Sequence, residues 1–105
     1  MASQIGGGTS EDIKEKSSHK TKKPRMYRVV LHNDDYTTRE FVVEVLVKVF
    51  HKPIMQATRI MLDVHRKGRG TVGTYTYDIA QTKVATVHKM AREQEFPLKC
   101  TIEEA

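Results

Sequence analysis

The residues best suited to chemistry in this chain are one amide and two carboxylates in a row, Asn33, Asp34 and Asp35, here called the acceptor cluster. A turn needs only one Asn or Asp side chain to satisfy its backbone, so the cluster offers more hydrogen-bond acceptors than a turn requires. Oxygen acceptors grouped in this way suit a small cation. The sequence therefore indicates either a cation-binding site or an acceptor-rich turn at this point.

The acceptor cluster could also be a structural turn or a divalent metal site. The first is a hydrogen-bonded turn in which Asp34 or Asp35 favours the N-terminus of a following helix. The second is a divalent metal site, but calcium and magnesium loops place more oxygen ligands at fixed intervals, and the chain has no DxDxDG pattern. We expect no metal and no cofactor, and composition alone leaves the turn and the cation site open.

Two further residues, His65 and Cys100, could take part in chemistry. His65 closes an apolar helical stripe, where a histidine is more often structural than functional. Cys100 lies in an alternating, strand-like stretch, and no serine has a nucleophile-elbow context such as GxSxG. The sequence thus predicts no catalytic residue, and we do not expect an enzyme. A single cysteine cannot form an intrachain disulfide, which favours a cytoplasmic location.

The acceptor cluster lies between a predicted strand and a predicted helix. Residues 27–31 (YRVVL) alternate as in a strand, with Tyr27, Val29 and Leu31 on one face. Residues 37–40 (TTRE) have the spacing of a capping box, and apolar residues recur behind them at helical intervals. The cluster should therefore occupy the turn between the end of the strand and the start of the helix.

The rest of the chain predicts two more helices and two more strands. Pro53 in a first turn and Gly68 just past an end delimit a second helix. Residues 71–77 are rich in β-branched and aromatic side chains and predict a strand, followed by Asp78 as the N-cap of a third helix. Alternation over residues 98–102 predicts a last short strand. The order β-α-α-β-α-β predicts a small single α+β domain, a three-stranded, mostly antiparallel sheet with three helices on one face.

The positive charge of the chain is concentrated in its N-terminal tail. The 105 residues carry a net charge of +5, of which residues 1–25 account for +3. These residues have few apolar side chains, so burial would not offset the entropy lost by ordering their backbone. We expect a disordered extension over residues 1–25 and a folded domain over residues 26–105. No apolar run approaches the roughly 20 residues of a membrane span, so we expect no membrane partner.

The basic residues 20–25 (KTKKPR) suggest a rival function, a small nucleic-acid-binding module that acts through its Lys-rich tail. Two observations count against it. The remaining chain keeps only +2 of the net charge, and Tyr36 beside two aspartates is a poor place for a phosphate backbone. Peptide binding that needs a free N-terminus, set against salt-dependent binding of DNA or RNA, would separate the two functions.

Four blocks of the sequence follow one another in a characteristic order and spacing. They are VLHNDDYT at residues 30–37, MLDVH at 61–65, TKVA at 82–85, and the stretch from ARE at 91–93 to PL at 97–98. Together they resemble the ClpS family of N-degron adaptors, and the resemblance spans residues 26–105. It implies a fold similar to the C-terminal domain of the ribosomal stalk protein, in agreement with the α+β order read from the residues.

The resemblance implies an adaptor that recognises the first residue of a substrate and delivers the substrate to the ClpA unfoldase of the ClpAP protease. By analogy, Asn33, Asp35 and His65 contact the free α-amino group of the substrate, and Asp34 assists through water or charge. An apolar pocket would hold the bulky first side chain, typically Phe, Tyr, Trp or Leu. The residues implied for this pocket are Leu31, Thr37, Arg39, Val42, Met61, Val64 and Leu98.

The resemblance also implies a docking surface. A patch near the start of the third helix would bind the N-terminal domain of a ClpA-type AAA+ unfoldase, and Asp78 and Lys83 are the residues carried over. Helix capping is the alternative role of Asp78. The tail resembles the flexible extension with which the family engages the unfoldase. We expect a cytoplasmic monomer that binds N-degron peptides and proteins, with neither nucleic acid nor membrane as a partner.

Arg39 departs from the family pattern, since many members carry at this position a methionine that gates the pocket. An arginine could fold its stem over the pocket, stack on an aromatic ligand, or face water without a role. The hypothesis from the sequence is an altered tolerance for Ile or Val as the first residue, with aromatic ligands favoured.

Overall fold

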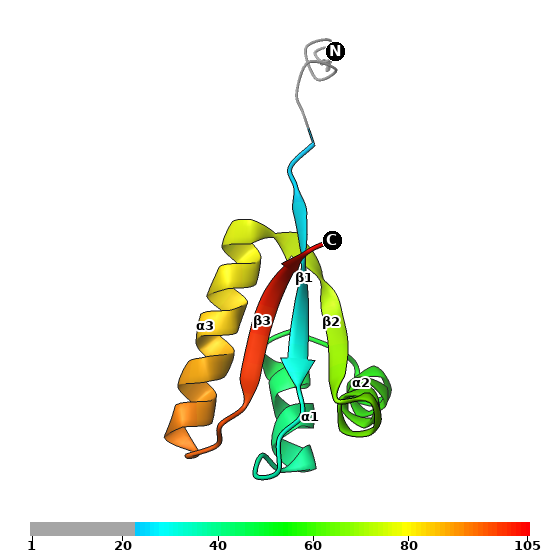
Figure 1. The fold of residues 1–105 in the computed structure, drawn as a ribbon, viewed down its shortest axis with the longest axis vertical. Helices are drawn as coiled ribbons and strands as arrows, with labels where there is room; N and C mark the ends of the chain where they lie inside the picture. Colours follow the sequence, from blue (N-terminus) through cyan, green and yellow to red (C-terminus); the bar gives the residue numbers. More distant parts are fainter. Residues whose placement is uncertain (1–22) are drawn as a thin grey trace, which may run out of the picture.

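The structure, a computed structural model that describes residues 23–105, is a layer of strands covered by helices (Figure 1). Most of the predicted disordered extension lies outside the described residues. The elements, in chain order, are β1 (Met26–His32), α1 (Arg39–Lys48), α2 (Ile54–Lys67), β2 (Arg69–Thr76), α3 (Tyr77–Glu93) and β3 (Lys99–Glu104). This order confirms the predicted α+β fold.

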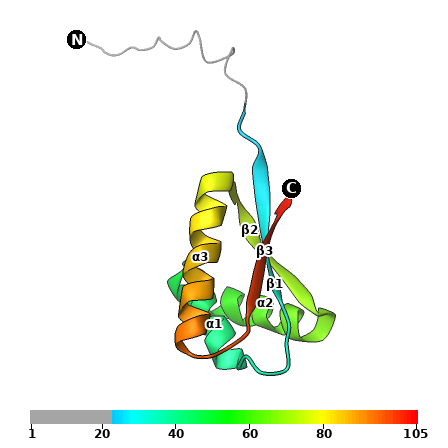
Figure 2. The same ribbon diagram turned by 60° about the vertical axis from the view of Figure 1, so that its left-hand side comes forward.

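β1 is the central strand of the sheet, which has the order β2-β1-β3 with both pairs antiparallel. The alternation predicted for β1 is present, since Val29 and Leu31 are fully buried in the core and Tyr27 packs against it. The three helices stand on one side of the sheet (Figures 1 and 2). The core therefore lies between this side of the sheet and the helices.

Each helix contributes an apolar stripe to the core. The valines of α1 are poor helix formers, so burial must stabilise this helix against its low propensity. None of the helices described is long and apolar enough to span a membrane. The fully or nearly buried helical residues are Phe41, Val42, Val45 and Leu46 of α1, Ala57, Ile60 and Val64 of α2, and Ala80, Val87 and Ala91 of α3.

Two helix starts differ from the predicted caps. The capping-box spacing of residues 37–40 would begin at Thr37, but Thr38 caps α1, since its hydroxyl accepts a 3.1 Å hydrogen bond from the Phe41 backbone amide. The prediction of Asp78 as the N-cap of α3 is wrong, because the helix begins at Tyr77 directly after Thr76. Asp78 therefore lies in the first turn, where a carboxylate still interacts favourably with the helix dipole.

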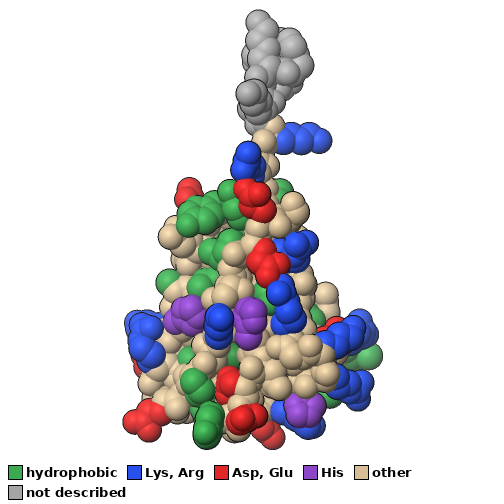
Figure 3. Space-filling view, viewed as in Figure 1, with side chains coloured by type: hydrophobic (Ala, Val, Ile, Leu, Met, Phe, Trp, Pro, Cys, Tyr) green, Lys and Arg blue, Asp and Glu red, His purple; other side chains and the backbone are tan. Residues whose placement is uncertain are grey.

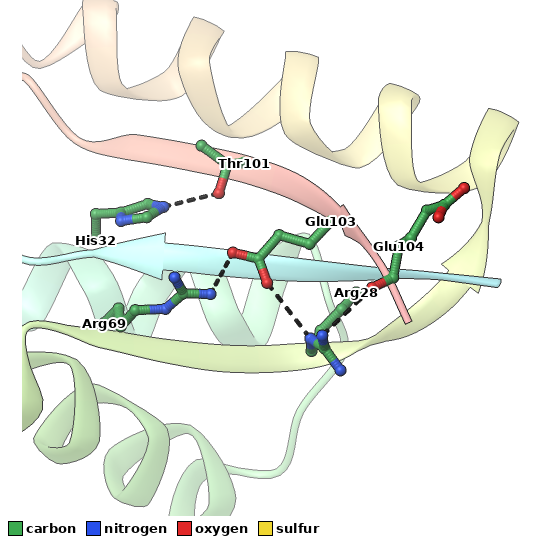
Figure 4. Close-up of polar contacts among 6 residues, drawn as sticks. All are labelled: Arg28, His32, Arg69, Thr101, Glu103 and Glu104. Atoms are coloured by element: carbon green, nitrogen blue, oxygen red, sulfur yellow. Dashed lines mark hydrogen bonds and ion pairs between the residues drawn. The ribbon is translucent and has the colours of Figure 1, made fainter.

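The face of the sheet that points away from the helices carries Arg28, His32, Arg69, Thr101 and Glu103 (Figure 4). Glu103 of β3 accepts a hydrogen bond from Arg69 of β2 and lies 3.6 Å from the Nε of Arg28 on β1, so one carboxylate links all three strands. The hydrogen bond from Arg69 is the main cause of a lowered pKa of Glu103. His32 contacts the Thr101 hydroxyl at 2.7 Å, and burial is the main cause of its lowered pKa.

Candidate functional site

The candidate site forms where the loop after β1 meets the end of α2. Pairing of β1 with β2 sets His32 opposite Arg69, which brings the chain beyond β1 to the C-terminal end of α2. There the Asn33 backbone amide donates a 2.9 Å hydrogen bond to the Gly68 carbonyl. Gly68 has a φ of 89°, a left-handed conformation that glycine adopts readily and that ends the helix. The acceptor cluster and His65 consequently line one cavity.

Asp34 is the member of the acceptor cluster that builds the turn. Its Oδ1 accepts hydrogen bonds from the backbone amides of Tyr36 at 2.8 Å and Thr37 at 2.7 Å, and its Oδ2 accepts one from the Thr37 hydroxyl at 2.7 Å. Partial burial by itself raises the pKa of the Asp34 carboxyl, but these hydrogen bonds together outweigh burial and lower the pKa. Asp34 thus holds the shape of the loop.

Asp34 should make the stability of the protein depend on pH in acid. Because folding lowers the pKa of this carboxyl, its stabilising effect is complete above the ordinary value of 3.8 and is lost as the pH falls through the folded-state value. Urea unfolding between about pH 6 and about pH 2.5 should show a smaller loss of stability for Asp34→Asn than for the natural chain. Equal losses would argue against this role for Asp34.

Asn33 and Asp35 keep their acceptors available. Both side chains are exposed, and neither makes a hydrogen bond or ion pair with another residue in the range 23–105. The division of the cluster is therefore clear: one carboxylate satisfies the loop, and the other carboxylate and the amide face the cavity.

Arg39, in the first turn of α1, reaches His65, in the last turn of α2. The distance between the Arg39 Nη2 and the His65 Nε2 is 2.7 Å, and both side chains are exposed. A guanidinium only donates hydrogen bonds, so Nε2 is the acceptor and the single ring proton of the neutral imidazole lies on Nδ1. No sequence pattern predicted this contact, which joins the two helices at the site.

A cavity of about 460 Å³ lies between the loop, α1 and α2, a size typical of small-ligand sites. The acceptor cluster lines its loop side, and Val42, Met61 and Val64 form an apolar wall on its helix side. The other lining residues are Tyr36, Thr37, Thr38, Arg39, Glu40 and His65. The cavity therefore presents hydrogen-bond acceptors and an apolar wall to the same small ligand.

Most residues predicted for the site surround this cavity, but Leu31 and Leu98 do not line it. The two residues are 0% and 4% exposed and belong to the core, Leu31 on β1 and Leu98 just before β3. Conversely, Tyr36, Thr38 and Glu40 line the cavity without having been predicted. Their proximity to the acceptor cluster in sequence was the available signal.

The two residues predicted to dock an unfoldase have different surroundings. Asp78 is exposed in the first turn of α3. The Nζ of Lys83 donates to the Val49 carbonyl at 2.9 Å and lies 5.6 Å and 5.5 Å from the ring centres of Phe50 and Tyr75. The Lys83 ammonium thus caps the C-terminal end of α1 and packs on two aromatic rings. Lys83 has a structural role whether or not it also meets a partner.

Chemistry elsewhere in the described chain is limited. Burial raises the pKa of the Cys100 thiol to about 12, so the thiol stays protonated and unreactive. The Cys100 backbone amide donates to the His88 Nε2 at 3.1 Å, which satisfies a donor on the outer edge of β3. Within residues 23–105, no three His, Cys, Asp or Glu side chains gather closely enough to hold a metal ion.

Comparison with known proteins gives the family. The model of the family described as ATP-dependent Clp protease adaptor protein ClpS matches residues 22–101. The chain belongs to the ClpS family. It is 66% identical over 85 residues to the ATP-dependent Clp protease adapter protein ClpS of Syntrophus aciditrophicus (strain SB), covering 81% of this chain and 79% of that protein. It is 62% identical over 91 residues to the protein of the same name from Acetivibrio thermocellus, covering 87% and 92%.

A solved structure of the family supports the fold and the assignment. Agrobacterium tumefaciens ClpS2 bound to L-phenylalaninamide matches with a TM-score of 0.76 at 41% identity, covering 79% of this chain and 100% of that chain. The family resemblance predicted from the four sequence blocks is therefore confirmed. The chain is a substrate adaptor of the Clp protease and not an enzyme, so its partners are the protease and peptide substrates.

Proposed function

We propose that this adaptor binds substrates by their first residue, through the free α-amino group and a bulky Phe, Tyr, Trp or Leu side chain, and delivers them to the ClpA unfoldase of ClpAP. One observation carries the proposal. The acceptors of Asn33 and Asp35 share a cavity with the apolar wall formed by Val42, Met61 and Val64. An N-terminal residue presents the two complementary groups, an ammonium and a side chain, on the same Cα atom.

The polar half of the cavity suits an α-ammonium group. Such a group has three N–H donors and no acceptor, so a matched receptor offers acceptors only. The Asn33 carbonyl and the Asp35 carboxylate meet this requirement, and the His65 Nε2 would meet it once Arg39 no longer donates to it. Asp34 contributes negative charge nearby while it holds the loop, which agrees with an assisting role.

The apolar half suits a large hydrophobic side chain. Val42 and Val64 are 6% and 3% exposed, so the core holds them in place, while Met61 is half-buried and can adapt its shape. The Thr37 hydroxyl donates a hydrogen bond to Asp34, so the methyl group of Thr37 remains available to the ligand. L-phenylalaninamide, the ligand of the ClpS2 relative, combines a free amine with a benzyl group and so supports a ligand of this class here.

Delivery requires a second surface, which we assign to the start of α3. Asp78 lies there between Tyr77 and Ile79, whose side chains are 47% and 49% exposed, as expected of a partner surface. Figure 1 shows the start of α3 at the opposite end of the sheet from the loop after β1. The N-terminal domain of ClpA would dock at this patch, to which Lys83 of the same helix would also contribute. Residues 1–25 would engage the unfoldase as well.

A degradation assay tests this function. ClpAP should degrade a reporter that starts with Phe faster when the adaptor is present, whereas the same reporter starting with Ala should show no acceleration. Asp78→Lys should reduce the acceleration several-fold without changing the affinity for a Phe-starting peptide. Glu93→Lys, the same charge change at the other end of α3, serves as the control. Acceleration that ignores the first residue would contradict the proposal.

We propose that the adaptor works in the cytoplasm as a monomer and without nucleic acid. On the face of the molecule shown in Figure 3, Lys and Arg side chains are interspersed with Asp and Glu. Such mixing does not favour a phosphate backbone, which prefers a continuous basic surface. Salt-dependent binding of DNA or RNA would instead favour the nucleic-acid module considered above.

A further inference from the structure

The contact between Arg39 and His65 places a cation on one of the acceptors that a ligand ammonium would use. The 2.7 Å hydrogen bond occupies the Nε2 lone pair, and a neutral imidazole has only one such lone pair. Both side chains line the cavity. A guanidinium and an α-ammonium that share one acceptor also repel each other. The ligand must therefore displace Arg39 from His65 to reach that nitrogen.

We propose that the displaced Arg39 selects for a carboxylate on the second residue of the ligand, which makes it a specificity-determining residue. The inference rests on the proposed function, because it assumes that the first residue fills the cavity. The side chain of the second residue would then lie at the opening of the cavity, next to the exposed Arg39. An Asp or Glu at this position would replace His65 as the partner of the guanidinium, through a charge-assisted hydrogen bond.

The surroundings of Arg39 support this movement. Within residues 23–105 its guanidinium has no carboxylate partner within 4.0 Å, so displacement from His65 breaks no ion pair. A second, shallower hollow of about 380 Å³ adjoins the first, and Arg39, Glu40 and Met61 line both. This hollow gives the Arg39 side chain and a second ligand residue room to meet outside the cavity.

The test compares three peptides that start with Phe and differ only in a second residue of Glu, Gln or Lys. The natural chain should bind the Glu peptide about three-fold more tightly than the Gln peptide, and the Lys peptide more weakly still, as expected of an exposed charge pair. In Arg39→Gln the three affinities should converge, and the Gln peptide should bind more tightly than to the natural chain because the competitor for His65 is gone. Arg39→Glu should reverse the order.

Arg66→Gln is the matched control, since Arg66 is an exposed cation next to His65 that does not line the cavity. It should keep the natural order, and about 1 M salt should weaken the order in the natural chain. Equal affinities for the three peptides in the natural chain, or an order that survives in Arg39→Gln, would overturn the inference while leaving the proposed function intact. Failure of all three peptides to bind would instead overturn the proposed function.

A ligand-free measurement checks the contact itself and detects a variant that has misfolded. The ¹⁵N shifts of the His65 ring should show a proton on Nδ1 in the natural chain and a mixture of tautomers in Arg39→Gln. Unchanged amide shifts in the strands would show that this variant is folded. Identical ring shifts in the two proteins would overturn the inferred competition for Nε2.

Discussion

Replacing Asp35 with Asn should weaken the binding of a Phe-starting peptide by about 30-fold, which corresponds to about 2 kcal/mol for a lost charge-assisted hydrogen bond. Asp35 is exposed and makes no hydrogen bond within residues 23–105, so the melting temperature should not change. Asp34→Asn should lower the melting temperature, because three hydrogen bonds of the loop end on its carboxylate, and should weaken binding less than Asp35→Asn does. Calorimetric titration and thermal unfolding measure the two effects separately.

Asp63→Asn controls for the change in net charge. Asp63 lies on α2, pairs with Lys67 at 3.7 Å and does not line the cavity, so its loss should leave peptide affinity unchanged. If Asp35→Asn bound the peptide as tightly as the natural chain, the division of the acceptor cluster into a structural and a ligand-facing carboxylate would be wrong.

Replacing Gly70 with Ala should destabilise the protein by about 2 kcal/mol and weaken peptide binding as well. A Cβ at Gly70 would lie 2.8 Å from the Val64 Cγ2 and 3.4 Å from the Ile60 carbonyl oxygen, so α2 would have to move away from β2. Val64 and His65 belong to the displaced turn and line the cavity. Urea unfolding and peptide titration of the same variant should therefore both show a loss.

Gly73→Ala is the matched control on the same strand. A Cβ there would lie 2.9 Å from the Tyr75 hydroxyl oxygen, the far end of a half-buried side chain that does not line the cavity. It should cost less stability and leave peptide affinity unchanged. A Gly70→Ala variant that kept both full stability and full affinity would show that the close approach of α2 to β2 does not position the site.

The elements that position the site were predictable because their signals are local. The alternation of residues 27–31 defines β1, and Pro53 and Gly68 delimit α2 within a residue of its observed ends. The acceptor cluster was identified because residue types alone show a surplus of acceptors. Which carboxylate the loop uses was not predictable, since it depends on the backbone path through Tyr36 and Thr37.

The features that were missed depend on tertiary packing. The start of α3 was misplaced because β2 stays paired with β1 as far as Thr76, and the helix follows at once. The contact of Lys83 with the end of α1 and the Arg39–His65 hydrogen bond both join elements distant in sequence. Composition and periodicity contain no information about such contacts, which exist only after the helices have packed.

The site combines the loop after β1 with the C-terminal end of α2, and the start of α1 completes it. The β1–β2 pairing and the Asn33–Gly68 hydrogen bond bring the loop and the end of α2 together, and the core behind Val42 and Val64 keeps the apolar wall in place. Because the fold fixes these positions before a ligand arrives, little ordering is needed on binding.

Recognition of a free α-amino group is tested most directly by comparing a Phe-starting peptide with its N-acetylated twin. Burying a Phe-sized side chain contributes about 3 kcal/mol, whereas association costs at least about 4 kcal/mol, so the apolar wall alone cannot hold the ligand. We predict that acetylation lowers affinity at least about 100-fold, more than exchanging Phe for Leu, because the acceptors of Asn33 and Asp35 lose their partner. Equal affinities for the two peptides would contradict recognition of a free α-amino group.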